Sequence, residues 1–143
     1  MSKKMRSLGL TVIFCVMLSI GFLQAPNPSY AFEITIDVAP QTLNIQSQSQ
    51  VVTVHTNIAF SSVVGGSVTM NGIDIAWWKA DNQGNFVAKF TMSEVKELAV
   101  TGKLEVPGEN MLTLTGYTND RAEFTGTQSI TVIDVLPTGS GGK

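Results

Sequence analysis

The residue types that most often carry out catalysis or bind metals are scarce in this sequence. His55 is the single histidine, and it falls on the polar side of an alternating segment, where a solvent-exposed side chain is expected. A hydrolytic triad would need a serine and an acid beside it, and the sequence contains no Gly-x-Ser-x-Gly motif. Cys15 is the single cysteine and lies inside an N-terminal apolar run. We therefore expect no enzyme active site and no cofactor.

Paired carboxylates are the next candidates, since two of them can hydrolyse a glycosidic bond. Glu94 and Glu97 are close enough in sequence to form such a pair. However, Thr91 and Glu94 also have the spacing of a capping box at the start of a helix. Apolar residues recur at helical spacing just after Thr91. This pattern predicts a short helix over 92–99, with Glu94 as a capping residue.

A polar stretch at 81–85 contains side-chain oxygens that a calcium ion could use. Asp81 can supply a carboxylate, and Asn82 and Asn85 can supply amide oxygens. Calcium takes about six to eight oxygen ligands, so backbone carbonyl groups would have to complete the site. Asp, Asn and Gly are also the residues that hairpin turns favour. A weak calcium site and a plain turn are therefore both open interpretations.

Trp77 and Trp78 form the most distinctive pair in the sequence. Neighbouring residues on a strand point to opposite faces of a sheet. We therefore expect one tryptophan in the core, as in many β-sandwiches, and the other exposed. An exposed aromatic ring can stack on a sugar or anchor a protein partner. It can equally cover a sheet edge, so the pair is a candidate binding site with a structural alternative.

The elements that position these residues are predicted to be mostly strands. The segments in which apolar and polar residues alternate are 34–38, 50–58, 85–91, 111–117 and 128–133. Turn signals separate the segments at intervals typical of all-β domains, and Asn71-Gly72 is the strongest of these signals. We expect an antiparallel β-sandwich or barrel of seven to nine strands with one short helix, over 32–136. A flexible Gly/Ser tail follows at 137–143.

The N-terminus has the layout of a secretory signal peptide. Three basic residues precede an apolar run at Leu8–Leu23, and small residues at Ser29 and Ala31 follow it. We expect residues 1–31 to be removed by cleavage after Ala31. The alternative is an uncleaved membrane anchor, although the run of 16 residues is short against the roughly 20 that span a bilayer. Cys15 does not fit a lipid-attachment site, because a bulky residue precedes it.

Charge is distributed unevenly around the expected cleavage site. All 11 acidic residues follow Ala31, whereas three of the nine basic residues precede it. The remaining chain is therefore acidic, which argues against nucleic acid as a partner. It also contains no second apolar stretch of membrane length. We expect a secreted or periplasmic protein, or one associated with the cell surface, with no membrane span after cleavage.

Three segments in order resemble an immunoglobulin-like β-sandwich domain found in secreted and cell-surface proteins of bacteria and archaea. The segments are 38–54, with Pro40 and Leu43-Asn44; 88–98, with Lys89-Phe90; and 114–133, with Phe124-Thr125-Gly126. The resemblance implies an immunoglobulin-like fold without catalytic residues. Such domains usually accompany other modules, whereas here we expect a single domain. Relatives often carry an acidic, calcium-like turn, which here retains only the carboxylate of Asp81.

Two functions follow from these observations. The first is a non-catalytic structural or protein-interaction module in the cell envelope or outside the cell, since sandwiches offer edge strands to other chains. The second is a small carbohydrate-binding module, in which an exposed tryptophan at 77 or 78 stacks on a sugar. The expected partners are accordingly another envelope or extracellular protein, or a glycan.

Overall fold

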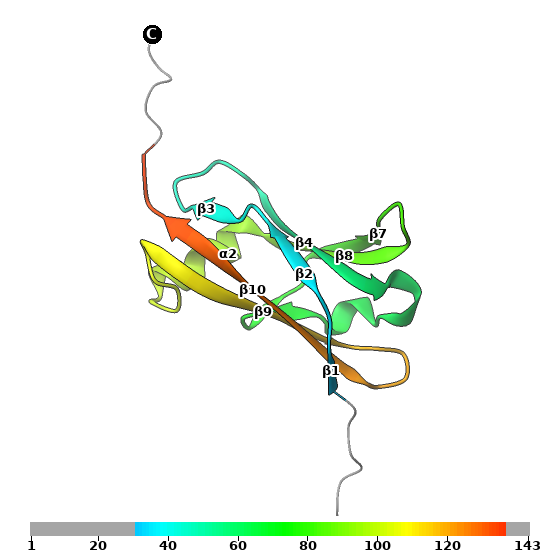
Figure 1. Ribbon diagram of the computed structural model, residues 1–143. Helices are drawn as coiled ribbons and strands as arrows, with labels where there is room; N and C mark the ends of the chain where they lie inside the picture. Colours follow the sequence, from blue (N-terminus) through cyan, green and yellow to red (C-terminus); the bar gives the residue numbers. More distant parts are fainter. Residues whose placement is uncertain (1–30, 137–143) are drawn as a thin grey trace, which may run out of the picture.

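The computed structural model describes residues 31–136, which form two β-sheets packed face to face with one α-helix (Figure 1). The strands are β1 (Ala31–Glu33), β2 (Ile36–Ala39), β3 (Thr42–Asn44), β4 (Val51–Ala59), β5 (Thr69–Met70), β6 (Ile73–Asp74), β7 (Trp77–Ala80), β8 (Asn85–Thr91), β9 (Gly108–Tyr117) and β10 (Glu123–Ile133). The helices are η1 (Phe60–Ser62), η2 (Gly65–Ser67) and α2 (Met92–Val100). The predicted all-β class is confirmed.

The smaller sheet has four strands in the order β2-β4-β8-β7, and all of its pairings are antiparallel. Its inner face follows the alternation read from the sequence. Val52, Val54 and Ile58 of β4 point inward, as do Phe86 and Phe90 of β8. His55 lies on the opposite, exposed face of β4, as predicted.

The larger sheet has the order β1-β10-β9-β5-β6, with β3 also pairing with β10. The long β9–β10 hairpin is antiparallel, but β1 and β3 both run parallel to β10. In Figure 1, β1 lies beside the beginning of β10 and β3 lies beside its end. These parallel pairs depart from the wholly antiparallel sandwich expected, because the N-terminal segment enters the sheet along the same direction as β10.

The core between the sheets is aliphatic and aromatic. Its largest fully buried side chains are Phe86, Phe90, Phe124, Leu43, Met70, Met92, Leu112, Leu114 and Ile130. Helix α2 closes one end of the core with its apolar side, from which Met92, Val95 and Leu98 are buried. The predicted helix over 92–99 is thus confirmed and extends by one residue to Val100. At its start, the Thr91 hydroxyl donates to the Glu94 carboxylate, in place of the backbone bonds of a capping box.

The structure contains ten strands among residues 31–136, which is more than the seven to nine expected. Strand ends that the sequence does not predict lie where the chain crosses from one sheet to the other. One crossing lies at 34–35, between β1 and β2, and another at 75–76, between β6 and β7. Alternation cannot reveal such a crossing, because the two-residue period is the same in either sheet. The Asn71-Gly72 turn is confirmed, and both residues have positive φ.

We call the edge of the sandwich where β1, β2 and β3 lie the closed side. There the N-terminal segment pairs with β10, moves to β4 and returns to β10. Between these pairings, the Gln128 side chain of β10 accepts a hydrogen bond from the Val38 backbone N–H. The chain passes so close to Gly126 that a Cβ there would lie 2.5 Å from Ile36 Cγ2. The edge of β10 is therefore paired with β1 and β3 on this side, while β2 pairs with β4 and meets β10 through the Gln128 side chain.

We call the opposite edge, formed by β6 and β7, the open side. The connection at 75–76 is held by two backbone bonds, from Ile75 N to Val68 O and from Ala76 N to Lys89 O. Strand β7 then pairs with β8 alone. Within residues 31–136, no strand pairs with the outer edge of β7.

The signal peptide predicted over 1–31 lies outside the described residues except for Ala31, and so does the tail predicted over 137–143. No α-helix of the described part has the length and apolar character needed to cross a membrane.

Candidate functional site

Strand β7 is the most exposed strand of the smaller sheet, and it contains both tryptophans of the chain. Asp81 N donates to Asn85 O at the end of the β7–β8 hairpin, which fixes the alternation of the ladder. Hydrogen-bonded pairs recur at every second residue of an antiparallel ladder. Lys79 and Trp77 therefore direct their backbone groups toward β8. Trp78 and Ala80 direct theirs outward, away from the sheet.

Both tryptophans are exposed, with 48% of Trp77 and 41% of Trp78 accessible to solvent. The prediction that one of them lies in the core is wrong. The two rings do point to opposite faces, since Trp77 is paired with the outer-face residue Lys89 and Trp78 with buried Ala88. The reason for the error is the position of β7 at the sheet edge, where the facing sheet no longer covers the inner side.

Trp78 rests on a glycine instead of entering the core. A Cβ added to Gly65 of η2 would overlap Trp78 Cε2, so the ring lies directly against the glycine backbone. Gly65 is buried by this contact. One face of the Trp78 ring is thereby fixed, while much of the rest of the side chain stays accessible to solvent.

Trp77 lies on the outer face of the smaller sheet beside a lysine. Lys89 Nζ is 5.3 Å from the centre of the Trp77 ring, which is the range of a cation–π contact. The same ammonium donates to Thr53 Oγ1 on β4 at 2.9 Å. Lys89 is therefore held between its two neighbouring strands, and the contact orients the Trp77 ring on the sheet.

The rest of this outer face is mostly polar, with the buried Val87 of β8 as an apolar exception. Asp37 of β2 is paired with His55 of β4, and His55 with Val87 of β8. A shallow hollow of about 270 Å³ lies beside them, between β2, β4 and the turn at Asp81. The outer face thus combines one aromatic ring with amide, hydroxyl and charged groups.

The Asp81 side chain holds the β7–β8 turn together through hydrogen bonds. Its Oδ1 accepts hydrogen bonds from the backbone N–H groups of Gln83, at 2.8 Å, and Asn85, at 2.9 Å. The Asn85 N–H lowers the pKa of the Asp81 carboxyl most, against a partial opposing effect of desolvation. Gln83 N–H and the nearby His55 lower this pKa further. These bonds support the turn interpretation for Asp81, Asn82 and Asn85.

The described residues contain no group of three or more His, Cys, Asp or Glu side chains that could hold a metal ion. Glu94 and Glu97 are both exposed on α2, whereas His55 is on β4. The structure therefore brings the two tryptophans and the Asp81 turn together on one hairpin. It does not bring the glutamates to that hairpin.

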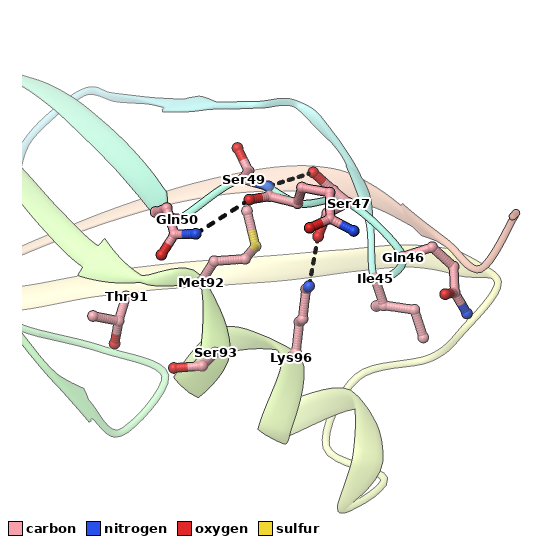
Figure 2. A pocket seen from close by; sticks show the side chains of 10 residues that line it. Ile45, Gln46, Ser47, Ser49, Gln50, Thr91, Met92, Ser93 and Lys96 are labelled. Atoms are coloured by element: carbon pink, nitrogen blue, oxygen red, sulfur yellow. Dashed lines mark hydrogen bonds between the residues drawn. The ribbon is translucent and has the colours of Figure 1, made fainter. Parts of the chain in front are cut away.

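A larger hollow lies elsewhere, between the loop 45–50 and the start of α2 (Figure 2). It has a volume of about 450 Å³ and is lined mainly by serine and glutamine. Figure 2 shows Lys96 Nζ donating to Ser47 O, at 2.7 Å. Ser49 N donates to Ser47 Oγ, and Gln50 Nε2 to Gln48 O. The polar groups of this loop are thus engaged largely with one another, which explains the hollow as loop structure.

Sequence reasoning missed the exposed backbone edge of β7. One available signal is Ile75-Ala76, a short apolar link between the segments that form β6 and β7. Lys79 is a second signal, since lysine is frequent on edge strands.

Comparison of this chain with protein families, curated proteins and solved structures finds no match.

Proposed function

We propose that this chain is an exported, non-catalytic β-sandwich module of immunoglobulin-like topology that binds another protein in the cell envelope or outside the cell. The observation that carries the proposal is the free outer edge of β7, with two exposed tryptophans on it. An extended segment of a partner can add to such an edge through backbone hydrogen bonds, while neighbouring side chains supply specificity.

The order of the strands supports the immunoglobulin-like part of the proposal. One sheet of an immunoglobulin domain has the order A-B-E-D, and the other contains C, F and G. Here β2-β4-β8-β7 corresponds to A-B-E-D, and β10-β9-β5 corresponds to G-F-C. In that correspondence β7 is strand D, an edge strand, and α2 occupies the connection between E and F.

Export is supported by the N-terminal pattern and by where the core begins. Cleavage after Ala31 would leave every fully buried core residue in place, because the first core residue in the chain is Ile36. Mass spectrometry of the protein recovered from the periplasm or the medium tests this point. A chain beginning at Phe32 is expected, and an intact N-terminus in a membrane fraction would contradict it.

The experiment on the interaction uses a proline at Ala80. Ala80 directs its backbone N–H outward, so Ala80→Pro removes a donor that β8 does not use, whereas Ala80→Ser keeps it. The tagged full chain is expressed in its own cells, and proteins that co-purify from the envelope are identified for both variants. A specific partner retained by Ala80→Ser and lost by Ala80→Pro is expected. Equal retention by both variants would contradict binding at the edge.

A second function, carbohydrate binding, is favoured by the position of Trp77. Its ring lies on an outer face that also carries hydroxyl, amide and charged groups, which is the setting in which a sugar ring can stack. A glycan array of the wild type, Trp77→Ala and Trp78→Ala tests this. The function requires binding that Trp77→Ala abolishes and Trp78→Ala preserves. Absence of binding by the wild type would remove it.

A further inference from the structure

We propose that the partner of the β7 edge is a second copy of this chain, paired with it in antiparallel fashion about a two-fold axis at Trp78. This inference rests on the proposed function, because it uses the same edge. It adds which molecule pairs with β7, a second copy, and which residues lie opposite each other. The resulting dimer joins the two smaller sheets into one continuous sheet, in which each β7 is an interior strand.

The backbone of β7 allows this pairing at Trp78. The outward N–H and C=O of Trp78 can each bond to Trp78 of the second copy, as in a hydrogen-bonded antiparallel pair. Ala80 then lies opposite Ala76 of the second copy, and its outward N–H faces that residue's carbonyl. The two-fold symmetry is the usual one for a homodimer, in which the same patch serves on both subunits.

The side chains of β7 select this register, because the strand is complementary to itself. Trp77 and Lys79 lie two residues apart on the same outer face, one on either side of Trp78. An antiparallel two-fold at Trp78 therefore places each Trp77 opposite Lys79 of the other copy. This directly opposed pair does not share hydrogen bonds, so its side chains are close, and its chemistry is that of a cation–π contact.

The Trp77 ring already accepts such a contact within one copy. Lys89, its cross-strand neighbour on β8, has its ammonium 5.3 Å from the ring centre. In the dimer, Trp77 lies between Lys89 of its own copy and Lys79 of the other. Each copy contributes one aromatic ring and one lysine to the interface, so the contact between Trp77 and Lys79 occurs twice in the dimer.

Two registers further along the strand are less favourable. Moving the axis to Lys79 places the two Lys79 ammonium groups directly opposite each other, which is a destabilising like-charge pair. Moving it to Ala80 places Lys79 opposite Asp81, but β7 ends at Ala80, so Trp77 and Trp78 would face the 81–84 turn of the other copy instead of its strand. On the inner face, the Trp78 register also sets the two Trp78 rings next to each other, each resting on its own Gly65.

Disulfide trapping tests the register. The full chain carries Cys15→Ser, so that an introduced cysteine is its only thiol. In a hydrogen-bonded pair the two Cα atoms are about 5.5 Å apart, within disulfide range, so Trp78→Cys should cross-link on mild oxidation. Ala80→Cys is the matched control, since four residues, or about 13 Å along the strand, separate position 80 from its copy. We expect at least about a tenfold higher cross-linking rate for Trp78→Cys.

Native mass spectrometry and light scattering of the wild type provide the second readout, which does not depend on replacing a tryptophan. The wild type should show a concentration-dependent doubling of mass. Ala80→Pro should be monomeric under the same conditions, while Ala80→Ser remains dimeric. Trp77→Ala should weaken the dimer by about tenfold or more, which corresponds to about 1.4 kcal/mol.

Several outcomes would overturn the inference. A wild type that stays monomeric at high concentration is one, and a dimer that Ala80→Pro leaves intact is another. Faster cross-linking at position 80 than at position 78 would contradict the register. A monomeric chain whose envelope partner is nevertheless lost by Ala80→Pro would retain the proposed function and reject the second copy as occupant. If Ala80→Pro kept both the dimer mass and the envelope partner, the proposed function and the second copy as occupant would both be rejected.

Discussion

The closed side and the open side of this sandwich show two ways in which a chain can cross between sheets. On the closed side, the segment 31–45 crosses twice and pairs with a strand at each stage. On the open side, the chain crosses once at 75–76 and leaves β7 with a single neighbour. The first arrangement pairs the edge of β10 with β1 and β3, and the Gln128 side chain accepts an outward N–H of β2. The second leaves alternate N–H and C=O groups of β7 facing outward.

The difference indicates how the molecule manages its edges. An unpaired edge is a template for another strand, and proteins usually cover it or protect it with charge. On the closed side the edge is covered by the protein's own N-terminal segment. On the open side it carries Lys79 and two tryptophans, a combination that limits indiscriminate pairing while offering contact area to a suitable partner.

The largest effect is expected from filling Gly126 on the closed side. In Gly126→Ala, the new Cβ would lie 2.5 Å from Ile36 Cγ2 and 3.1 Å from the Ile34 carbonyl oxygen, so the crossing segment must shift. We expect a loss of about 2–3 kcal/mol in the free energy of unfolding, measured by urea titration with circular dichroism.

The matched variant on the open side is Gly65→Ala. The three atoms nearest to its new Cβ all belong to the Trp78 ring, which is partly exposed and can swing away. The free energy of unfolding should fall by less than in Gly126→Ala. An equal or larger loss would show that Trp78 is as firmly held as the closed side, and the contrast between the two sides would fail.

A second prediction concerns a side chain that bridges the two sheets on the closed side. Gln128→Leu removes the acceptor of the Val38 N–H and leaves that partly buried donor without a partner. We expect a loss of about 1–3 kcal/mol in the free energy of unfolding. Gln128→Glu keeps an acceptor and should be less costly. Thermal unfolding of the three proteins side by side provides the measurement.

Proline scanning of β7 sharpens the description of the open side. Ala80→Pro removes an outward N–H and should change the free energy of unfolding of the monomer by no more than about 0.5 kcal/mol. Lys79→Pro removes an N–H directed toward β8 and should cost about 1–3 kcal/mol. If the two substitutions exchanged their effects in chemical denaturation of the monomer, our assignment of the outward residues would be reversed.

The smallest effect is the pH dependence of the Asp81 turn. The pKa of Asp81 is lowered below its ordinary value of 3.8 in the fold, chiefly by the Asn85 N–H. The charged carboxylate therefore stabilises the fold above that pH, and this contribution disappears as the pH falls through the lowered pKa. Asp81→Asn should be slightly less stable than the wild type at pH 7.

The difference in stability between the wild type and Asp81→Asn should vanish in strong acid. The side-chain amide oxygen introduced by Asp81→Asn can still accept the backbone hydrogen bonds. Asp81→Ala offers no acceptor and therefore serves as the control for the loss of the bonds themselves. Unfolding curves of the three proteins at pH 7 and at a pH well below 3.8 provide the measurement. A gap between the wild type and Asp81→Asn that persisted in acid would assign the effect to shape instead of charge.

Much of the fold was predictable from local patterns. The two-residue alternation identified the inward residues of β4 and β8, and helical spacing identified α2, because both depend on neighbours in sequence. The Asn71-Gly72 turn was predictable because few other residue pairs accept positive φ at both positions.

The arrangement at the two edges was not predictable in the same way. Whether β1 and β2 belong to one strand or to two sheets depends on Gly126 and Gln128, which lie about 90 residues further along the chain. The exposure of Trp78 likewise depends on Gly65 and on the absence of a further strand beyond β7 among residues 31–136. Of the two expectations for Trp77 and Trp78, the exposure of one ring is confirmed and the burial of the other is wrong.

The placement of both tryptophans on β7 also gives the molecule a built-in optical probe. The chain contains two tryptophans, and both lie at the open edge instead of in the core. Their emission in the folded protein should therefore lie closer to that of solvent-exposed indole than the emission of a core tryptophan does. A strand that covers β7 would remove water from these rings and shift their emission to shorter wavelength. Intrinsic fluorescence is thus a direct, label-free reading of whether the edge is occupied.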